Sequence, residues 1–157
     1  MATGESTENR VTVSQLAPGD RARWNELWTQ YQEFYSVIIP AEASDATWTR
    51  IQSGRIRGFG ARDPIGGLVG IVHCLFHEDT WSLAPACYLQ DLYVDPAQRG
   101  GGCGRMLVEA VAAAARAAGA SAPYWLTHAT NATARRLYDQ LGKNHGFIHY
   151  GYVDARS

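Results

Sequence analysis

Apolar and polar residues in the first third of this 157-residue chain predict a strand followed by two helices. We expect residues 1–10, which are polar, to form a frayed tail. Weak alternation over residues 11–16 predicts a strand, and Pro18-Gly19-Asp20 predicts a turn in which Asp20 can cap a helix. Apolar residues then repeat at helical spacing up to Pro40: Trp24, Leu27, Trp28, Tyr31 and Tyr35.

A second, shorter helix is predicted after Ser44 or Asp45, carrying Trp48 and Ile51 and ending near Gly54. The spacing then changes to that of strands, over residues 56–61, 67–76 and 86–94. The Asp63-Pro64 and Asp95-Pro96 pairs mark the turns that end two of these strands. Because these strands follow one another directly, we expect an antiparallel meander.

The last third predicts helices that alternate with strands. A long helix from Arg105 to about Ala118 should end at Gly119, and residues 124–127 predict a short strand. Asn131 opens a helix that ends at Gly142 and is followed by a final strand over residues 147–153. Four residues of this last helix repeat at helical spacing: Ala134, Leu137, Tyr138 and Leu141.

The predicted order is β-α-α-β-β-β-α-β-α-β, which indicates an α/β fold with helices on the faces of a mixed sheet. Most strand pairs are expected to be antiparallel, and the late strand-helix-strand unit predicts a parallel pair. We see no internal repeat and no long linker, so residues 11–157 are predicted to form one domain.

Composition narrows the class of protein. The net charge of −1 and the isoelectric point near 6.5 give no sign of a nucleic-acid partner, which would need a basic face. The three cysteines favour a reducing, cytoplasmic location over a disulfide framework. We find no signal peptide and no apolar run of the ~20 residues that a membrane span requires, so no membrane partner is expected.

A glycine loop between a strand and a helix carries the strongest chemical signal, in residues 91–107 (DLYVDPAQRGGGCGRML). Glycines allow a close approach of backbone to ligand, and the first amides of a helix attract anions, so the loop predicts a diphosphate site. The P-loop pattern fails because Arg105 and Met106 follow Gly104, and the dinucleotide pattern fails because Arg105 stands where its third glycine would be. A plain flexible turn is the alternative interpretation.

The run Arg99-Gly100-Gly101-Gly102-Cys103-Gly104 resembles the acetyl-CoA signature R/Q-x-x-G-x-G/A of the GNAT superfamily of N-acetyltransferases. The resemblance implies a sheet whose central parallel pair is splayed apart, and it implies acetyl-CoA as co-substrate. The phrases YLQDLYVDP and NATARRLYDQLG are most similar to the branch of small-amine, polyamine and Hpa2-like acetyltransferases. The implied coenzyme-binding residues are Leu92, Tyr93, Val94, Arg99, Gly100, Gly101, Gly102, Cys103, Gly104, Arg105, Asn131 and Ala134.

A second signature of the same family, N-x-x-A-x-x-L/F-Y, is resembled by residues 131–138. Asn131 and Tyr138 lie two helical turns apart on similar faces. The resemblance implies that Asn131 contacts the pantetheine region and that the Tyr138 hydroxyl is the general acid that protonates the departing thiolate. Taken alone, Tyr138 would be interpreted as a core aromatic residue.

The general base is harder to assign. Some family members place a glutamate on the strand before the loop, and Gln90 occupies that position here, where an amide cannot act as a base. Asp91 is the nearest carboxylate and our candidate catalytic group, although strand alternation should turn it to the sheet face opposite Gln90. We expect Glu33, Tyr35 and Gln90 to line the acceptor pocket. Glu42, Trp48 and His128 are weaker candidates, with Trp48 expected mainly to pack.

Other constellations are less persuasive. His73 and His77 share a strand face while Cys74 opposes them, and no second ligand pair has zinc-like spacing, so we expect no metal. Cys103 suits packing in the loop better than nucleophilic chemistry.

The function predicted from this sequence is direct transfer of acetyl from acetyl-CoA to a primary amine of a small molecule, such as a polyamine or an amino acid. A lysine or N-terminal protein acetyltransferase and an acyl-CoA-binding sensor without turnover are the alternatives. The C-terminal strand that we predict would present an unpaired edge, so a homodimer is expected.

Overall fold

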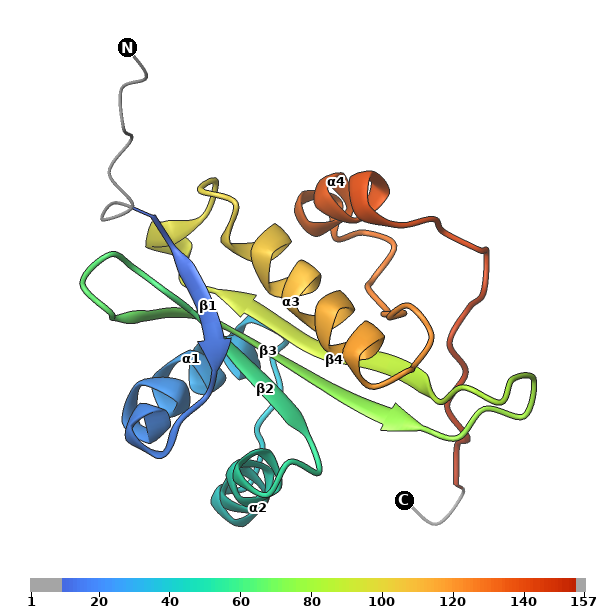
Figure 1. Ribbon diagram of the computed structural model, residues 1–157, viewed down its shortest axis with the longest axis horizontal. Helices are drawn as coiled ribbons and strands as arrows, with labels where there is room; N and C mark the ends of the chain where they lie inside the picture. The colour runs from blue at the N-terminus through green and yellow to red at the C-terminus, as the bar shows by residue number, and fades with distance from the viewer. Residues whose placement is uncertain (1–9, 155–157) are drawn as a thin grey trace. The chain divides into compact units, whose positions relative to one another are not determined.

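The computed structural model describes residues 10–154, so the predicted tail lies outside the described residues except for Arg10. The chain divides into two compact units, Met1–Leu126 and Thr127–Ser157, which are described in turn. The first unit contains a four-stranded antiparallel sheet whose strands lie side by side in chain order (Figure 1). These strands are β1 (Thr12–Gln15), β2 (Arg57–Arg62), β3 (Leu68–His77) and β4 (Ala86–Val94).

Helices cover both faces of this sheet (Figure 1). The helices α1 (Arg21–Phe34) and α2 (Ala41–Gln52) precede the meander, and α3 (Cys103–Ala117) follows it. Two short 3-10 turns, η2 (Pro18–Asp20) and η3 (Pro96–Gln98), lead into α1 and into the glycine loop. The second unit contains α4 (Ala132–Leu141). The described residues thus confirm the predicted α/β class with helices on both faces of a largely antiparallel sheet.

The core of the first unit lies on both sides of β3, whose first seven residues are all buried. On one face Ile71 packs with Trp24, Leu27 and Trp28 of α1. On the other face α3 lies so close that a Cβ placed on Gly70 would be 3.1 Å from Cδ1 of Leu107. A side chain at position 70 would therefore fit only if its neighbours, the Leu107 side chain and the Tyr93 carbonyl at 3.2 Å, moved by a few tenths of an ångström.

Most predicted elements are confirmed with shifts of one or two residues at their ends, while two helix boundaries differ from the prediction. The first helix ends at Phe34, before Pro40, and Ser36 takes a left-handed φ of 53° in the connection. The helix α2 begins at Ala41, several residues before Ser44, because Pro40 occupies its N-cap position and proline readily precedes or opens a helix. Asp20 is the N-cap residue of α1, but its carboxylate binds Arg62 instead of the helix amides.

Two predicted strands are wrong. Of residues 124–127, only Tyr124 joins the sheet, through one parallel bridge to Tyr88. The predicted parallel pair is therefore confirmed only as this bridge, in which the Tyr124 amide donates to the Cys87 carbonyl and the Leu89 amide donates to the Tyr124 carbonyl, each at 3.0 Å. Residues 147–153 form no strand, because alternation of apolar and polar residues does not by itself supply a neighbouring strand to pair with. Five of their apolar or aromatic side chains are mostly exposed, namely Phe147, Ile148, Tyr150, Tyr152 and Val153.

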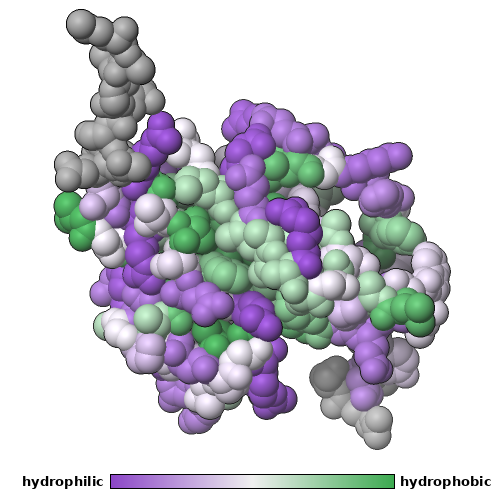
Figure 2. All heavy atoms as spheres, in the orientation of Figure 1, coloured by the Kyte–Doolittle hydropathy of each residue, from purple (hydrophilic) through white to green (hydrophobic). Residues whose placement is uncertain are grey.

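The surface of the first unit includes an apolar area over α3. Figure 2 shows moderately apolar residues gathered above this helix, which is rich in alanine, with strongly polar residues around them. Among the described residues, no helix has both the length and the apolar character to cross a lipid bilayer.

Candidate active site

The glycine loop joins the end of β4 to the start of α3. Asp95 opens it by accepting a hydrogen bond from the Ala97 amide at 3.0 Å, which sets the 3-10 turn η3. Gly100 and Gly102 then take φ values of +86° and +82°, a region that other L-residues adopt at a cost. Gly102 is the N-cap residue of α3. Because glycine has no side chain, it cannot accept a hydrogen bond from the first amides of the helix.

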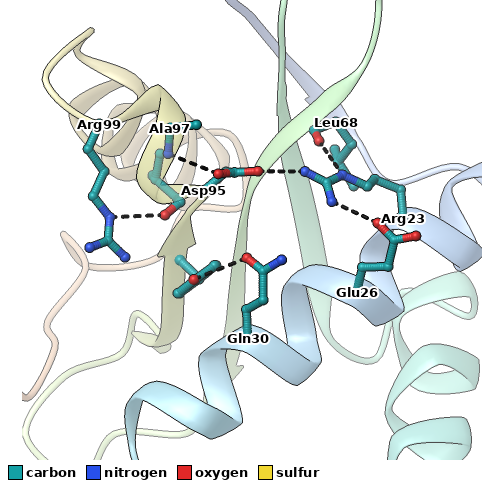
Figure 3. Close-up of polar contacts among 9 residues, drawn as sticks. Arg23, Glu26, Gln30, Leu68, Asp95, Ala97 and Arg99 are labelled. Carbon is teal, nitrogen blue, oxygen red and sulfur yellow. Dashed lines mark hydrogen bonds and ion pairs between the residues drawn. The ribbon is translucent and has the colours of Figure 1, made fainter.

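Arg23 of α1 ties the start of this loop to the sheet (Figure 3). Its Nη2 donates to Oδ2 of Asp95 at 2.7 Å, and its Nε donates to the Leu68 carbonyl at 3.0 Å. The third guanidinium nitrogen binds Glu26 at 2.7 Å. The Ala97 amide and the Arg23 guanidinium hold the pKa of Asp95 below its usual value, so the carboxylate stays charged and the loop stays anchored.

The loop residues fit a diphosphate. Glycine at positions 100 and 102 leaves open space, since a Cβ placed on either would meet no atom within 4 Å. The helix dipole of α3 and its first amides favour negative charge at this place. The Cζ atom of Arg99 lies 5.5 Å from the centroid of the Tyr93 ring, and its Nε donates to the Val94 carbonyl at 3.1 Å. The guanidinium of Arg99 therefore lies beside the end of β4.

The outer edge of β4 beyond Tyr88 is paired with no strand in the described part of the chain. The Asp95 amide donates inward to the Val69 carbonyl at 2.9 Å. Peptide groups alternate in direction along a strand, so those of Leu92 and Val94 face outward while that of Tyr93 faces β3. The backbone groups that are able to pair with an extended ligand arm are therefore those of Leu92 and Val94.

A pocket of about 450 Å³ opens on the α1 and α2 face of the sheet. Aromatic residues of α1 form one wall, and the side chains of Gln90 and Asp91 extend into it from β4. Its full lining is Trp28, Tyr31, Tyr35, Val37, Ile39, Thr47, Arg50, Ile56, His73, Gln90 and Asp91.

Asp91 is held by two neutral donors. The Tyr31 hydroxyl donates to Oδ1 at 2.8 Å, and Nδ1 of His73 lies 3.0 Å from Oδ2. His73 is almost completely buried, and its Nε2 accepts a hydrogen bond from the indole nitrogen of Trp24 at 2.9 Å. Because an indole N–H can only donate, Nε2 carries no proton, and His73 is a neutral imidazole that donates from Nδ1 to Asp91.

Burial raises the pKa of the Tyr31 hydroxyl far above its ordinary value, and the Asp91 charge and hydrogen bond raise it further. Burial and the same carboxylate also raise the pKa of Tyr35. Both phenols therefore stay protonated through the neutral range. The Tyr31 phenol therefore remains a hydrogen-bond donor to Asp91.

Gln90 and Asp91 line the same pocket, which corrects the expectation that they face opposite sides of the sheet. In the β3–β4 pairing, His73 is opposite Asp91 while Cys74 is opposite Leu89, so Gln90 is an extra residue in β4. Such a bulge interrupts the alternation and lets two consecutive side chains lie on one side. The bulge cannot be read from β4 alone, because it depends on the register with β3.

The structure brings together three of the predicted site residues, Tyr35, Gln90 and Asp91, in the pocket. Neither Glu33 nor Glu42 is among the lining residues, and their roles stay predictions. Trp48 packs against the core with its ring 5.1 Å from that of Trp24, as expected.

Sequence reasoning missed Tyr31 and His73 as polar partners of Asp91. The available signal was a histidine inside the otherwise apolar strand β3, which suggests a buried hydrogen-bonding role.

In the second unit, Asn131 caps α4 as predicted, with Oδ1 accepting from the Ala134 amide at 3.4 Å. Its side-chain amide also donates to the Thr127 hydroxyl at 3.3 Å. Tyr138 is half-buried and lies two turns beyond the cap, on the same helix face as Asn131. The helix ends at Gly142, whose amide donates to the Tyr138 carbonyl at 2.8 Å.

The three cysteines and His77 lie outside the lining of the pocket beside the bulge. Cys74, Cys87 and Cys103 are buried free thiols, and burial raises the pKa of each of them. Nε2 of His77 lies 2.8 Å from the hydroxyl of Tyr124, the residue that forms the parallel bridge to Tyr88. Among residues 10–154, no group of three or more histidine, cysteine, aspartate and glutamate side chains is placed to hold a metal ion.

The structure thus combines an open edge strand, a glycine loop that leads into the start of a helix, and a pocket beside the bulge, which offers separate places for two ligands. The family model described as "Acetyltransferase (GNAT) family" matches residues 22–143. The chain therefore belongs to the GNAT family of N-acetyltransferases, which use acetyl-CoA as the acetyl donor.

Similar proteins include a curated relative and several solved structures. The D-amino-acid N-acetyltransferase HPA3 of Saccharomyces cerevisiae is 33% identical over 136 residues, covering 85% of this chain and 84% of the relative. The structure of AAC(6')-Iy aligns with a TM-score of 0.80 at 19% identity, covering 92% of this chain and 98% of the other. An aminoglycoside acetyltransferase, meta-AAC0020, from an uncultured soil metagenomic sample aligns with a TM-score of 0.76 at 19% identity, covering 91% and 95%. At 19% identity, the likeness to these two structures shows the fold alone.

Proposed function

We propose that this N-acetyltransferase acts on a primary amine of a small molecule, held in the pocket beside the β4 bulge. The observation that carries the proposal is the Asp91 carboxylate, which extends into an aromatic pocket from the same strand that leads into the glycine loop. An ammonium group is attracted to a carboxylate whose charge is stabilised by neutral donors. Similarity to the yeast D-amino-acid N-acetyltransferase also favours a small acceptor.

The coenzyme site proposed here consists of the glycine loop and the outward peptide groups of β4. The amides of Gly102, Cys103 and Gly104 at the start of α3 would hold the diphosphate, with Arg99 and Arg105 adding positive charge. Leu92 and Val94 would bind the extended arm through their backbone. When bound, acetyl-CoA supplies an acetyl group activated as a thioester.

Asp91 is proposed to accept the proton that the ammonium group must lose before it can attack. An ordinary amine has a pKa near ~10, so most of it is protonated at neutral pH. Each oxygen of Asp91 accepts one hydrogen bond, from Tyr31 or His73, and retains a further lone pair for the acceptor amine or for a water. The aromatic wall would orient the acceptor in the pocket and keep bulk water from it.

Tyr138 is proposed to donate a proton to the sulfur as the thiolate leaves, on the basis of the family signature in α4. Tyr138→Phe is expected to lower kcat by about tenfold or more while the KM for acetyl-CoA changes little, because the hydroxyl acts on the leaving group. Tyr152→Phe, which removes an exposed hydroxyl outside the signature, is the matched control. Unchanged kcat in Tyr138→Phe across the pH range would remove Tyr138 from the mechanism.

An acceptor screen tests the proposal. Acetyl-CoA is incubated with the protein and with polyamines, free amino acids of both configurations, or basic peptides, and release of the CoA thiol is followed. We expect turnover with a small amine. Turnover with peptides alone would favour a protein acetyltransferase, and coenzyme binding without turnover on any acceptor would favour a sensor; either result overturns the proposal.

A further inference from the structure

The acceptor pocket contains one positive and one negative side chain that are contributed by different elements. Arg50 lines it from the last turn of α2, and Asp91 lines it from β4. His73, which lines the pocket beside them, is neutral because Trp24 donates to its Nε2, and the raised pKa values of Tyr31 and Tyr35 keep these two phenols protonated. The remaining lining residues are uncharged, so the pocket carries a separated pair of opposite charges.

Arg50 has no acidic partner among the described residues. Within residues 10–154 no carboxylate lies within ion-pair distance of its guanidinium. Other arginines of the same unit are paired, Arg21 with Asp45 and Arg23 with Asp95. A planar guanidinium with open donor positions is suited to bind a carboxylate through two parallel hydrogen bonds.

Asp91 has no positively charged partner among the described residues either. Its two partners, the Tyr31 hydroxyl and the neutral His73 imidazole, donate hydrogen bonds without adding positive charge. Neither partner supplies a positive charge that would compete with a bound cation. A ligand that presents an ammonium group to Asp91 and a carboxylate to Arg50 would complement both charges of the pocket.

We propose that the acceptor is a free amino acid, bound as a zwitterion with its amine at Asp91 and its carboxylate at Arg50. This inference rests on the proposed function and names the acceptor class for the same site. The side chain of the amino acid would lie against the aromatic wall of Trp28 and Tyr35, which contacts apolar groups well. Polyamines are disfavoured, because their second ammonium group would approach the Arg50 charge.

The test compares ligands that differ in the carboxylate. D- and L-methionine, methionine amide and the decarboxylated amine 3-(methylthio)propylamine are assayed as acceptors with the wild-type protein. We expect kcat/KM for the free acid of the preferred configuration to exceed that of its amide by about 10- to 100-fold, the usual value of a hydrogen bond to a charged group. Equal or better use of the amide or of the amine would overturn the proposal.

Variants of Arg50 assign the carboxylate contact. Arg50→Gln should lower kcat/KM for the free acid by about tenfold or more and leave the amide unaffected, and Arg50→Lys should recover part of the loss because it keeps the charge. Arg55→Gln, an exposed arginine outside the pocket, is the matched control and should behave as wild type. Equal losses for acid and amide would show that Arg50 only supports the end of α2, and would overturn the assignment.

A binding measurement separates this proposal from the proposed function. Calorimetric titration of methionine and of methionine amide into the full chain saturated with CoA reports the carboxylate preference without any turnover. Preference for the acid without acetyl transfer would overturn the proposed function alone. Acetyl transfer to small amines without that preference would overturn the amino-acid assignment alone.

Discussion

At the scale of single residues, the hydrogen bond from Trp24 to His73 decides how Asp91 behaves. It makes His73 a neutral donor, so that both hydrogen bonds to the Asp91 carboxylate come from uncharged groups. The composition of β3 and the helical spacing of Trp24 were visible in the sequence. The contact between Trp24 and His73 could not be predicted, because it depends on how α1 lies across β3.

Asp91→Asn tests the role of this carboxylate directly. The amide cannot take a proton from the acceptor, so kcat should fall by about 10²- to 10⁴-fold, the usual contribution of a general base. Steady-state kinetics at saturating acetyl-CoA measure the loss, with Glu109→Gln on the exposed side of α3 as the control. A decrease no larger than that of the control would exclude Asp91 as the base.

The raised pKa of Tyr31 leads to a prediction about the stability of the protein at alkaline pH. Its pKa is raised by burial and by Asp91, so the folded state retains this proton at pH values where the unfolded chain loses it. The protonated Tyr31 therefore makes its full contribution to the stability of the folded state below the ordinary tyrosine pKa of about 10. Above that pH the free energy of unfolding falls as the pH rises.

Tyr31→Phe removes this proton and should make the alkaline fall shallower by up to ~1.4 kcal/mol per pH unit. Urea unfolding between about pH 9 and pH 11 measures the slope, and Tyr150→Phe at an exposed position serves as the comparison. If the two variants have the same slope as wild type, Tyr31 does not retain its proton as described.

At the scale of elements, the glycine loop depends on backbone conformation more than on side chains. Gly102 ends the loop at φ +82° directly before α3, whereas Gly101 is not in the left-handed region. Gly102→Ala should lower the free energy of unfolding by about 1–2 kcal/mol, because an L-residue is strained there. Its affinity for CoA should fall as well, since relief of the strain would turn the first amides of α3 away.

Gly101→Ala is the matched control for Gly102→Ala. A Cβ at position 101 would meet its nearest atom, the Gln98 carbonyl oxygen, at an ordinary 3.7 Å. Urea unfolding and CoA titration of both variants give the comparison. Equal stability and equal CoA affinity for the two variants would contradict the role given to the conformation of Gly102.

The elements also show where sequence patterns suffice. β4 was predicted with both of its ends correct, and α4 was predicted to start at the Asn131 cap, because apolar runs, turns and caps are local signals. The bulge at Gln90 and the absence of a strand at residues 147–153 depend on pairing with other strands. Alternation along one segment does not reveal whether a partner is in register or present.

At the scale of the whole molecule, the family was recognisable from two short signatures, while the acceptor class was not. The glycine loop is continuous in sequence and keeps its motif. The pocket is assembled from α1, α2, β3 and β4, and its two charged residues are separated by about forty positions in the chain. Its preference for one ligand therefore becomes visible only when the elements are folded together.

Equilibrium titration of CoA into the full chain tests most directly the claim on which this account depends, that the start of α3 binds a diphosphate. We predict saturable binding at one site per chain, much weaker binding of pantetheine, which lacks the diphosphate together with the nucleotide, and weaker CoA binding by Gly102→Ala. Absence of saturable CoA binding, or equal affinity for CoA and pantetheine, would contradict the account.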